Sequence, residues 1–328
     1  MAPWADETIG RDAPAVLRVM RGDFFCMPFG GNTSAYRGEM HPPHGETANG
    51  RWRLEGRTDN TLHLSLTTRA RSGRIDKRIT LVDGHSAVYH EHTVSGMTGR
   101  ICLGHHSILQ LPDRPGAGRI STSRIRWGQT RPTALEAGTP GGRSVLEPGA
   151  RVGSLKAVKT TRGRTVDVSR YPARRGADDL IMVAAAKAPR LAWTALAVPS
   201  AGYVWFALRD PRVLRSTVMW FSNGGRPYAP WSDRHINVVG LEDVTAYFDY
   251  GLAESARANP LSRRGVPTSV ALRADRPFVT RYVTAVAAIP RGFDEVKTIK
   301  PGRGGVALTS VSGRRVQVPL DVGFVAGE

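Results

Sequence analysis

The chain has 328 residues, of which 41% are hydrophobic and 23% are charged, which is enough apolar sequence for a large core and excludes global disorder. The formal net charge is +18, but the arginines are dispersed, and no basic tail or basic amphipathic helix gathers them. We therefore interpret the charge mainly as compositional bias, with a polyanion-binding face and a phosphate-bearing small substrate left open as alternatives.

The predicted elements are mostly strands. Short helices are expected over Asp12–Val19 and over Leu252–Ala258, and Pro260 follows the second helix. Apolar and polar residues alternate strictly over Thr61–Thr67, which predicts a half-buried strand because successive side chains of a strand point to opposite faces. Shorter or less regular alternation predicts further strands at Arg78–Leu81, Ser86–His90, Arg164–Val168, Gly202–Ala207, Ser269–Leu272, Val279–Val283 and Gly313–Val318.

Glycine, proline, asparagine and aspartate separate these segments at short intervals. Asp83-Gly84 and Ser222–Gly225 are typical of hairpin turns. The 36 glycines and 22 prolines fit many strands joined by turns better than they fit long helices. Many evenly spaced strands with little helix indicate an all-β sandwich or barrel. Since no change of composition marks a boundary, we expect one domain over residues 1–328.

Four segments stand out because they hold histidine, arginine or carboxylate side chains beside glycine, proline and aromatic residues. In chain order they are Val19–Gly30, His41–Trp52, Leu103–Pro112 and Asn237–Thr245. Taken together, they resemble the galactose mutarotase-like superfamily, which includes aldose 1-epimerases and hexose-6-phosphate mutarotases. The resemblance covers about residues 15–290. It implies a large antiparallel β-sandwich, the galactose mutarotase-like supersandwich, with a sugar-binding cleft on one face.

The resemblance depends on the order and spacing of a few residues. In the superfamily an arginine-glycine pair leads to a Pro-Phe-Gly turn, and a Pro-x-His-Gly segment then runs through asparagine to tryptophan. A later histidine is followed by apolar residues, and a glutamate closes an apolar strand before the final strands. The matching residues here are Arg21, His44, Gly45, Asn49, Trp52, His106 and Glu242.

The sequence departs from this pattern at three places. Asp23-Phe24-Phe25 stands where the superfamily has Gly-Ile-Pro. The later histidine is doubled as His105-His106 and is followed by Ser107. Residues from about Val296 onward extend beyond the pattern. The identity of the sugar therefore stays open, and so to a lesser degree does the activity.

The resemblance implies an isomerase that interconverts the α and β anomers of a free or phosphorylated sugar. A base removes the proton of the anomeric hydroxyl, an acid protonates the ring oxygen, and the ring opens and closes again; a carboxylate and an imidazole suit these roles near neutral pH. The resemblance assigns Glu242 as the base, His106 as the acid and His44 as a partner of the ring oxygen or a neighbouring hydroxyl. The expected substrate-binding residues are Arg21, His105, Asn49 and Trp52. No metal or organic cofactor is expected.

Each assignment has a structural alternative. His44 lies among prolines and also fits a turn at the surface. His106 also fits a buried histidine bonded to the backbone, and His105 is then the alternative functional histidine. Glu242 also fits a carboxylate on an edge strand, paired with an arginine. Arg21 is one of 40 arginines, since six of the 46 basic residues are lysine.

Two further sets of residues have a functional and a structural interpretation. His90 and His92 are spaced for one face of a strand, but without a third ligand nearby we prefer an exposed strand face to a metal site. Most tryptophans belong to cores or interfaces, so we expect no more than one or two to line a sugar cleft. The candidates are Trp52, Trp127, Trp205, Trp220 and Trp231.

Four functions compete on these observations. The first is the mutarotase, and the second is a non-catalytic carbohydrate-binding protein on the same fold. A lyase or hydrolase on a related sandwich is the third, but a hydrolase usually needs two carboxylates, and only Glu242 is well placed by motif. A nucleic-acid binder explains the charge but none of the four segments. We therefore expect a small sugar or sugar phosphate as the partner and no nucleic acid; the oligomeric state stays open.

The cysteines and the apolar segments bear on location. Cys26 and Cys102 lie in apolar surroundings and predict two buried free thiols, and the absence of a Cys-x-x-Cys pair argues against a structural zinc site. No signal peptide is recognisable, and charged residues and a proline interrupt the most apolar segment, Leu180–Val198. We therefore expect a cytoplasmic protein without membrane contact.

Overall fold

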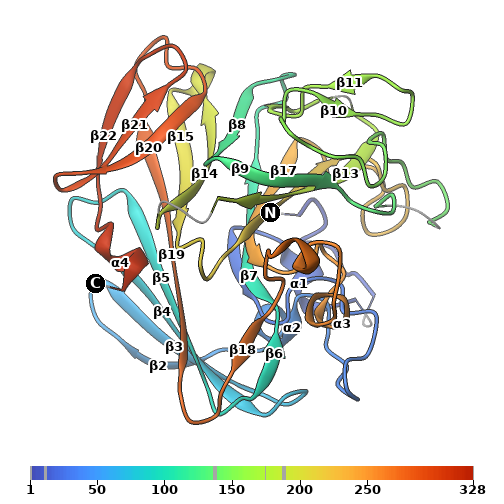
Figure 1. Cartoon of the computed structure of the whole chain (residues 1–328), viewed down its shortest axis with the longest axis vertical. Coiled ribbons are helices and arrows are strands. Elements are labelled where there is room, and N and C mark those ends of the chain that lie inside the picture. The colour runs from blue at the N-terminus through green and yellow to red at the C-terminus, as the bar shows by residue number, and fades with distance from the viewer. Residues whose placement is uncertain (1, 11–12, 136–138, 174, 187–189, 328) are drawn as a thin grey trace.

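The computed structural model describes residues 2–10, 13–135, 139–173, 175–186 and 190–327, and its regular elements are mostly antiparallel strands (Figure 1). The helices are short: α1 (Ala15–Val19), α2 (Gly45–Asn49), α3 (Leu252–Ala256) and α4 (Gly323–Ala326). This architecture confirms the prediction of an all-β sandwich with few helices. Asp12, the first residue of one predicted helix, lies outside the described residues.

The first large sheet has six strands in the order β1-β7-β17-β16-β13-β9, and every neighbouring pair is antiparallel. Its strands are β1 (Asp23–Cys26), β7 (Leu103–Gln110), β9 (Ile125–Thr130), β13 (Ala177–Ala185), β16 (Ser216–Asn223) and β17 (Val238–Thr245). Every residue of β13, β16 and β17 is buried, which explains why these strands show no alternation in the sequence.

The second large sheet has nine antiparallel strands in the order β12-β8-β14-β15-β19-β5-β4-β3-β2. Its strands are β2 (Arg53–Arg57), β3 (Thr61–Thr68), β4 (Gly73–Leu81), β5 (Ala87–Ser95), β8 (Gly118–Thr122), β12 (Arg170–Tyr171), β14 (Ala192–Val198), β15 (Tyr203–Arg209) and β19 (Phe278–Ala288). Residues of both large sheets join in the main hydrophobic core, among them Leu103, Met219, Leu196 and Tyr282. The two sheets therefore pack face to face as a sandwich.

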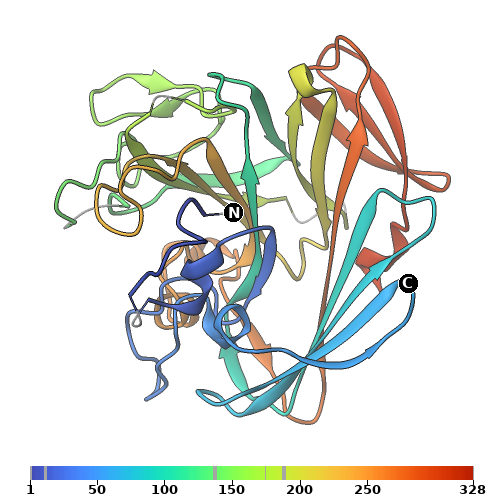
Figure 2. The same cartoon turned by 180° about the vertical axis from the view of Figure 1, so that it is seen from behind.

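Three small sheets complete the fold. The C-terminal segment that extends beyond the superfamily pattern forms a three-stranded sheet, in which Val306, Leu308 and Val318 pack against Tyr89 and Phe206 of the nine-stranded sheet. Figure 2 shows this sheet and the segment of α1 on different sides of the molecule. The small sheets comprise β6 (Gly99–Ile101) with β18 (Val270–Leu272), β10 (Val158–Lys159) with β11 (Thr165–Val166), and β20 (Val296–Gly302), β21 (Gly305–Ser310) and β22 (Arg315–Pro319).

The structure confirms some of the local predictions and contradicts others. Cys26 and Cys102 are buried free thiols, as predicted. The prediction of a tight hairpin turn at Ser222–Gly225 is wrong, because β16 ends at Asn223 and a loop of fourteen residues leads to β17. The exposed face expected for His90 and His92 is also wrong: His92 is 1% exposed and its ring stacks on Phe25 of the other sheet, with centroids 3.9 Å apart. No helix among the described residues is long and apolar enough to span a membrane.

Candidate functional site

A carboxylate and an imidazole face each other across two neighbouring strands. Glu242 of β17 is the cross-strand partner of His106 of β7, and paired residues of antiparallel strands point to the same face of the sheet. His106 Nε2 lies 3.3 Å from Glu242 Oε1. Glu242 is 2% exposed and His106 is 5% exposed. The pair therefore lies in a largely desolvated site on the face that is turned away from the nine-stranded sheet.

Gly240 makes room for this carboxylate. It lies two residues before Glu242 on the same face of β17, and a Cβ atom at this position would come within 2.5 Å of Glu242 Oε1 and 3.3 Å of Trp220 Cβ. Without a side chain at position 240, the carboxylate can lie back along its own strand beside His106. The Gly-Leu-Glu sequence at the end of the apolar run thus has a steric reason.

The His-Gly segment brings a third side chain to the pair. His44 has a left-handed backbone (φ 59°), and Gly45 follows with φ 76° against the backbone of Met27 and Pro28, where a Cβ atom would collide. This turn places the His44 ring perpendicular to that of His106, with centroids 5.0 Å apart. Glycine is therefore required after His44 by both its dihedral angle and its close packing.

Asn49 stabilises the same turn through hydrogen bonds of its side chain. Its Nδ2 donates to the carbonyls of Pro43 (2.7 Å) and Gly45 (2.8 Å), on either side of His44. Its Oδ1 accepts a hydrogen bond from the backbone N–H of Val16 in α1 (3.0 Å). Asn49 therefore links the His44 turn to α1 and acts on the site through the backbone.

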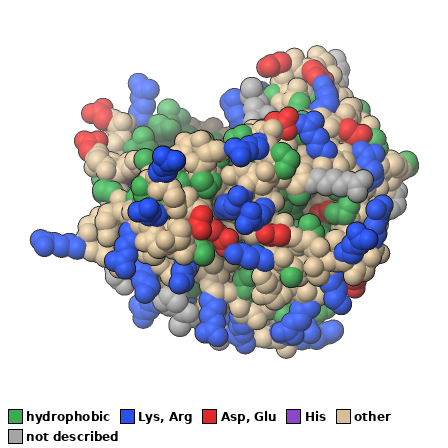
Figure 3. Space-filling model, turned by 90° about the horizontal axis from the view of Figure 1, so that it is seen from above, with side chains coloured by type: hydrophobic (Ala, Val, Ile, Leu, Met, Phe, Trp, Pro, Cys, Tyr) green, Lys and Arg blue, Asp and Glu red, His purple; other side chains and the backbone are tan. Residues whose placement is uncertain are grey.

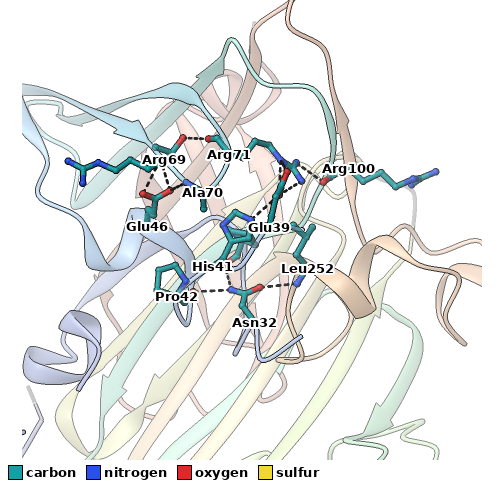
Figure 4. A network of polar contacts seen from close by, with 12 residues as sticks. Asn32, Glu39, His41, Pro42, Glu46, Arg69, Ala70, Arg71, Arg100 and Leu252 are labelled. Atoms are coloured by element: carbon teal, nitrogen blue, oxygen red, sulfur yellow. Dashed lines mark hydrogen bonds and ion pairs between the residues drawn. The ribbon is translucent and has the colours of Figure 1, made fainter. Parts of the chain in front are cut away.

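Figure 4 shows the network that holds the loop before His44. Asn32 Nδ2 donates to the carbonyl of Pro42 (3.1 Å), and Asn32 Oδ1 accepts from the N–H of Leu252 (2.9 Å). Arg71 forms an ion pair with Glu39 (2.7 Å) and donates to a backbone carbonyl at Arg100 (2.8 Å). These contacts fasten the loop to the sheets and to α3, so His44 is held by structure that lies well outside the site.

The three side chains open into one pocket with a volume of about 240 Å³. Its walls are mainly apolar and aromatic, and Phe24 stacks on His106 with centroids 4.6 Å apart. Its lining consists of Pro14, Val16, Leu17, Met20, Phe24, Pro43, His44, His106, Leu135, Leu180, Trp220, Arg226, Trp231, Glu242 and Asp249. Small-molecule sites are typically apolar concavities with a few convergent polar groups, and this pocket fits that description.

Two tryptophans and an arginine form one wall of the pocket. The Arg226 guanidinium lies over the rings of Trp231 (4.3 Å) and Trp220 (5.2 Å). Asp178 accepts a hydrogen bond from Trp220 Nε1 (3.1 Å) and lies 3.4 Å from Arg226 Nε. The charge of Arg226 is thus paired with a buried carboxylate, and its guanidinium packs over the two tryptophan rings.

Burial dominates the electrostatics of the site. It raises the pKa of Glu242 well above its usual range, with a smaller contribution from the Asp249 carboxylate. Burial also lowers the pKa of His106 well below its usual range, and that of His44 to about 4. Nδ1 of His44 and Nδ1 of His106 have no hydrogen-bond partner among the described residues. Buried polar atoms without partners mark a place where a ligand can bind.

Comparisons with known proteins bear on the fold. No family model and no curated protein matches the chain. Among solved structures, an aldose 1-epimerase candidate from Escherichia coli K12 superposes with a TM-score of 0.55 at 15% identity, covering 86% of this chain and 88% of that one. A galactose mutarotase related enzyme from Lactobacillus acidophilus gives 0.54 at 13% identity, covering 84% and 85%. This chain has the galactose mutarotase-like fold.

A third solved structure agrees with this assignment. An aldose 1-epimerase candidate from Klebsiella pneumoniae superposes with a TM-score of 0.57 at 12% identity, covering 84% of this chain and 66% of that one. The mutarotase-like supersandwich predicted from the sequence is therefore confirmed. At sequence identities of 12 to 15%, these superpositions establish the fold and do not establish the reaction, which depends on the residues of the site.

Of the site residues predicted from the sequence, some line the pocket and others lie elsewhere. Glu242, His106 and His44 line the pocket together, whereas the substrate-binding candidates Arg21, His105, Asn49 and Trp52 are absent from its lining. Arg21 is exposed. His105 is on the opposite face of β7 from His106, because successive strand residues alternate.

The indole of Trp52 is engaged elsewhere. Its Nε1 donates to the carbonyl of Thr47 (3.0 Å), and the Lys77 ammonium lies 4.1 Å from the centroid of its ring. Two of the five candidate tryptophans, Trp220 and Trp231, line the pocket. Nothing in the sequence distinguishes these two, because their loop and strand meet α1 only in the fold.

Other lining residues went unnoticed in the sequence. Phe24 belongs to the departure Asp23-Phe24-Phe25, and its register explains the triplet: Phe24 pairs with His106 on the pocket face, while Asp23 and Phe25 point between the sheets. Asp249 follows a segment without alternation. A residue that breaks a superfamily pattern beside a candidate catalytic histidine was the available signal for Phe24.

The basic residues do not gather at the pocket. Figure 3 shows lysine and arginine side chains spread over one whole face, with acidic side chains between several of them. Arg226 is the only basic residue among the described residues that line the pocket, besides its histidines. The site itself is therefore not strongly cationic, whatever the net charge of the chain.

Proposed function

We propose that the chain interconverts the α and β anomers of a neutral monosaccharide in this pocket. The observation that carries the proposal is the contact between Glu242 and His106, 3.3 Å apart within one largely apolar pocket. Anomer exchange needs one proton acceptor and one proton donor on neighbouring oxygens and no other chemistry. A buried carboxylate and imidazole supply both.

The reaction is balanced by one proton held between the two groups. Glu242 takes the proton of the C1 hydroxyl, the C1–O5 bond breaks as the carbonyl forms, and His106 gives its proton to O5. Rotation about the C1–C2 bond and the reverse steps return the other anomer. The opposite shifts of the two pKa values favour a pair that carries one proton in total, held on Glu242 at rest. The exchange begins once this proton has passed to His106 Nε2, which lies 3.3 Å from Glu242 Oε1.

His44 and the aromatic wall complete the proposal. The Nδ1 atoms of His44 and His106, which have no partner among the described residues, can bond sugar oxygens, and the parts of Trp220 and Phe24 that line the pocket can contact the apolar side of the ring. The charge inventory favours an uncharged sugar over a sugar phosphate. Arg226 is already paired with Asp178, and two carboxylates, Glu242 and Asp249, line the same pocket.

The test is a mutarotation assay on freshly dissolved α-anomers of several aldoses and aldose phosphates. Polarimetry or proton NMR measures the rate at which the anomers equilibrate. Wild type is expected to accelerate equilibration of a neutral aldose, and Glu242→Gln to slow it by about 10²–10⁴-fold. Glu295→Gln, which alters a surface carboxylate paired with Lys156, is the matched control and should retain the wild-type rate. Folded protein that accelerates no sugar but binds one would contradict catalysis and favour the carbohydrate-binding alternative.

A further inference from the structure

A second group of titratable side chains lies between the two large sheets, away from the pocket. Asp23 of β1, His90 of β5 and His105 of β7 each offer one ligand atom, and the three atoms lie within 4.8 Å of one another. Two of these strands belong to the six-stranded sheet and one to the nine-stranded sheet. The group therefore joins the two layers of the sandwich.

The group has the donor chemistry of a transition-metal site. Two imidazoles and a carboxylate are the ligands that zinc and similar divalent ions prefer, and three protein ligands leave a fourth position for water. Ligand atoms around a tetrahedral zinc are about 3.3 Å apart, given bonds of about 2.0–2.1 Å. His105 Nδ1 and Asp23 Oδ2 are 2.7 Å apart, and the His90 ligand atom lies within 4.8 Å of them, so binding needs a small separation of the first pair and an adjustment of His90.

Buried imidazole nitrogens without hydrogen-bond partners among the described residues make the interior space around the three ligand atoms polar. His105 is fully buried, and its Nε2 has no hydrogen-bond partner among the described residues. His92 is 1% exposed, and both of its ring nitrogens lack a partner within the same set of residues. The rings of His90 and His92 lie 5.4 Å and 5.1 Å from that of His105. Three imidazoles in one interior space are costly unless an ion or water satisfies them.

Neighbouring side chains orient the Asp23 carboxylate and place a positive charge near the group. Ser107 Oγ donates to Asp23 Oδ1 (2.9 Å), which leaves Asp23 Oδ2 for the ligand position. Lys77 pairs with His92 across β4 and β5, so its side chain enters the same space between the sheets. Its ammonium lies over the Trp52 ring, 4.1 Å from the centroid. That positive charge opposes a second cation, so Lys77 limits the affinity of the group.

We propose that Asp23, His90 and His105 bind one divalent transition-metal ion of the zinc class between the two sheets. The ion holds the layers together and is separate from the Glu242–His106 pocket, because His105 and His106 point to opposite faces of β7. It takes no part in the proton exchange proposed above. The two sites therefore succeed or fail independently.

The test uses full-length protein without a polyhistidine tag, stripped with EDTA and titrated with Co²⁺ or Zn²⁺. One ion per chain is expected by mass spectrometry of metal content, with visible Co²⁺ bands and a higher melting temperature. His90→Ala and, as a second variant, Asp23→Asn should weaken binding at least tenfold. Lys77→Met should tighten it by removing the opposing charge.

The matched control is His63→Ala. His63 Nε2 lies 2.8 Å from Asp76 Oδ1 in a half-exposed pair that has the same contact but belongs to no such three-residue group among the described residues. This variant should bind one ion as wild type does. Wild-type protein that binds no stoichiometric ion, or binding that persists unchanged in folded His90→Ala and Asp23→Asn, would overturn the proposal.

Discussion

The two faces of the strand pair β7–β17 differ in how they treat the same kinds of side chain. On the pocket face, Glu242 lies beside His106, and among the described residues no other charged group forms an ion pair with either of them. One residue further along, on the face between the sheets, Asp243 forms an ion pair with Arg209 (2.6 Å) and accepts from Thr217 (2.6 Å) and Tyr282 (3.1 Å).

The difference separates structural from functional carboxylates. Asp243 and Arg209 are both at most 1% exposed, and their hydrogen-bonding capacity is met within the core. Glu242 is buried almost as deeply, yet its partner is a histidine whose Nδ1 has no hydrogen-bond partner in the part of the chain that the structure describes. A fully satisfied buried charge stabilises one packing arrangement, whereas an incompletely satisfied one at a pocket is available to a substrate.

The largest expected effect tests the pocket face through its histidine. His106→Asn should lower kcat/KM for mutarotation by about 10²–10⁴-fold, because the proton donor is lost while the fold remains. His105→Asn, one residue earlier, should instead lower the free energy of unfolding by about 1–3 kcal/mol, since it breaks the contact with Asp23. Mutarotation rates and urea unfolding of both variants distinguish the faces; a larger rate loss in His105→Asn would reverse the assignment.

The next effect tests the interior face through its ion pair. Arg209→Met should cost about 3–5 kcal/mol in the free energy of unfolding, because Asp243 is left buried without a counter-charge. The control is Arg273→Met, which removes an exposed partner of Asp275 and should leave the free energy of unfolding nearly unchanged. Denaturant unfolding measures both, and equal losses would show that the interior pair has no special role.

Sequence reasoning reached the fold and the three central side chains but not the division between faces. Period-two alternation predicted β3 and, less regularly, β15. Among the wholly buried strands, β17 was reached only through the motif that contains Glu242, and alternation did not predict β13, β14 or β16. The doubled histidine at 105 and 106 was ambiguous, because one residue of register decides which imidazole meets the pocket. Register is fixed by pairing with β1 and β17, which lie far away in sequence.

The rest of the site depends on contacts that no local pattern encodes. Trp231 and Arg226 come from a loop, and α1 meets them only when the N-terminal segment folds back over the sheet. The sequence also could not show that Asp23 and His105 lie beside His90, because these two residues come from the opposite sheet. A strand pattern shows which residues share a face and gives no information about what lies across from that face.

A smaller effect tests how finely the pocket face is arranged. Gly240→Ala adds a methyl group that would meet Glu242 Oε1 at 2.5 Å, so the carboxylate must turn away from His106. Because the carboxylate end is flexible, stability should change little, while kcat/KM should fall by about 10–100-fold. Gly153→Ala, where a Cβ atom meets nothing within 4 Å, is the control. An unchanged rate in Gly240→Ala would mean that the observed carboxylate position is not the reactive one.

The smallest effect compares the two carboxylates through pH. Because burial raises the pKa of Glu242 in the folded protein, its protonated form is the one that folding favours. Stability from this group is complete below the unfolded pKa of about 4.5 and declines as pH rises towards the folded pKa, by at most about 1.4 kcal/mol per pH unit. Glu242→Gln should therefore become progressively more stable than wild type as the pH rises above 4.5.

Asp243→Asn should behave in the opposite way at neutral pH, because it leaves Arg209 buried without its counter-charge and lowers the free energy of unfolding. Urea unfolding of wild type and both variants from pH 5 to pH 9 measures the contrast. If Glu242→Gln were less stable than wild type across this range, the Glu242 carboxylate would be held by its neighbours as Asp243 is. The pocket face would then be a second structural network, and the proton-exchange proposal would lose its physical basis.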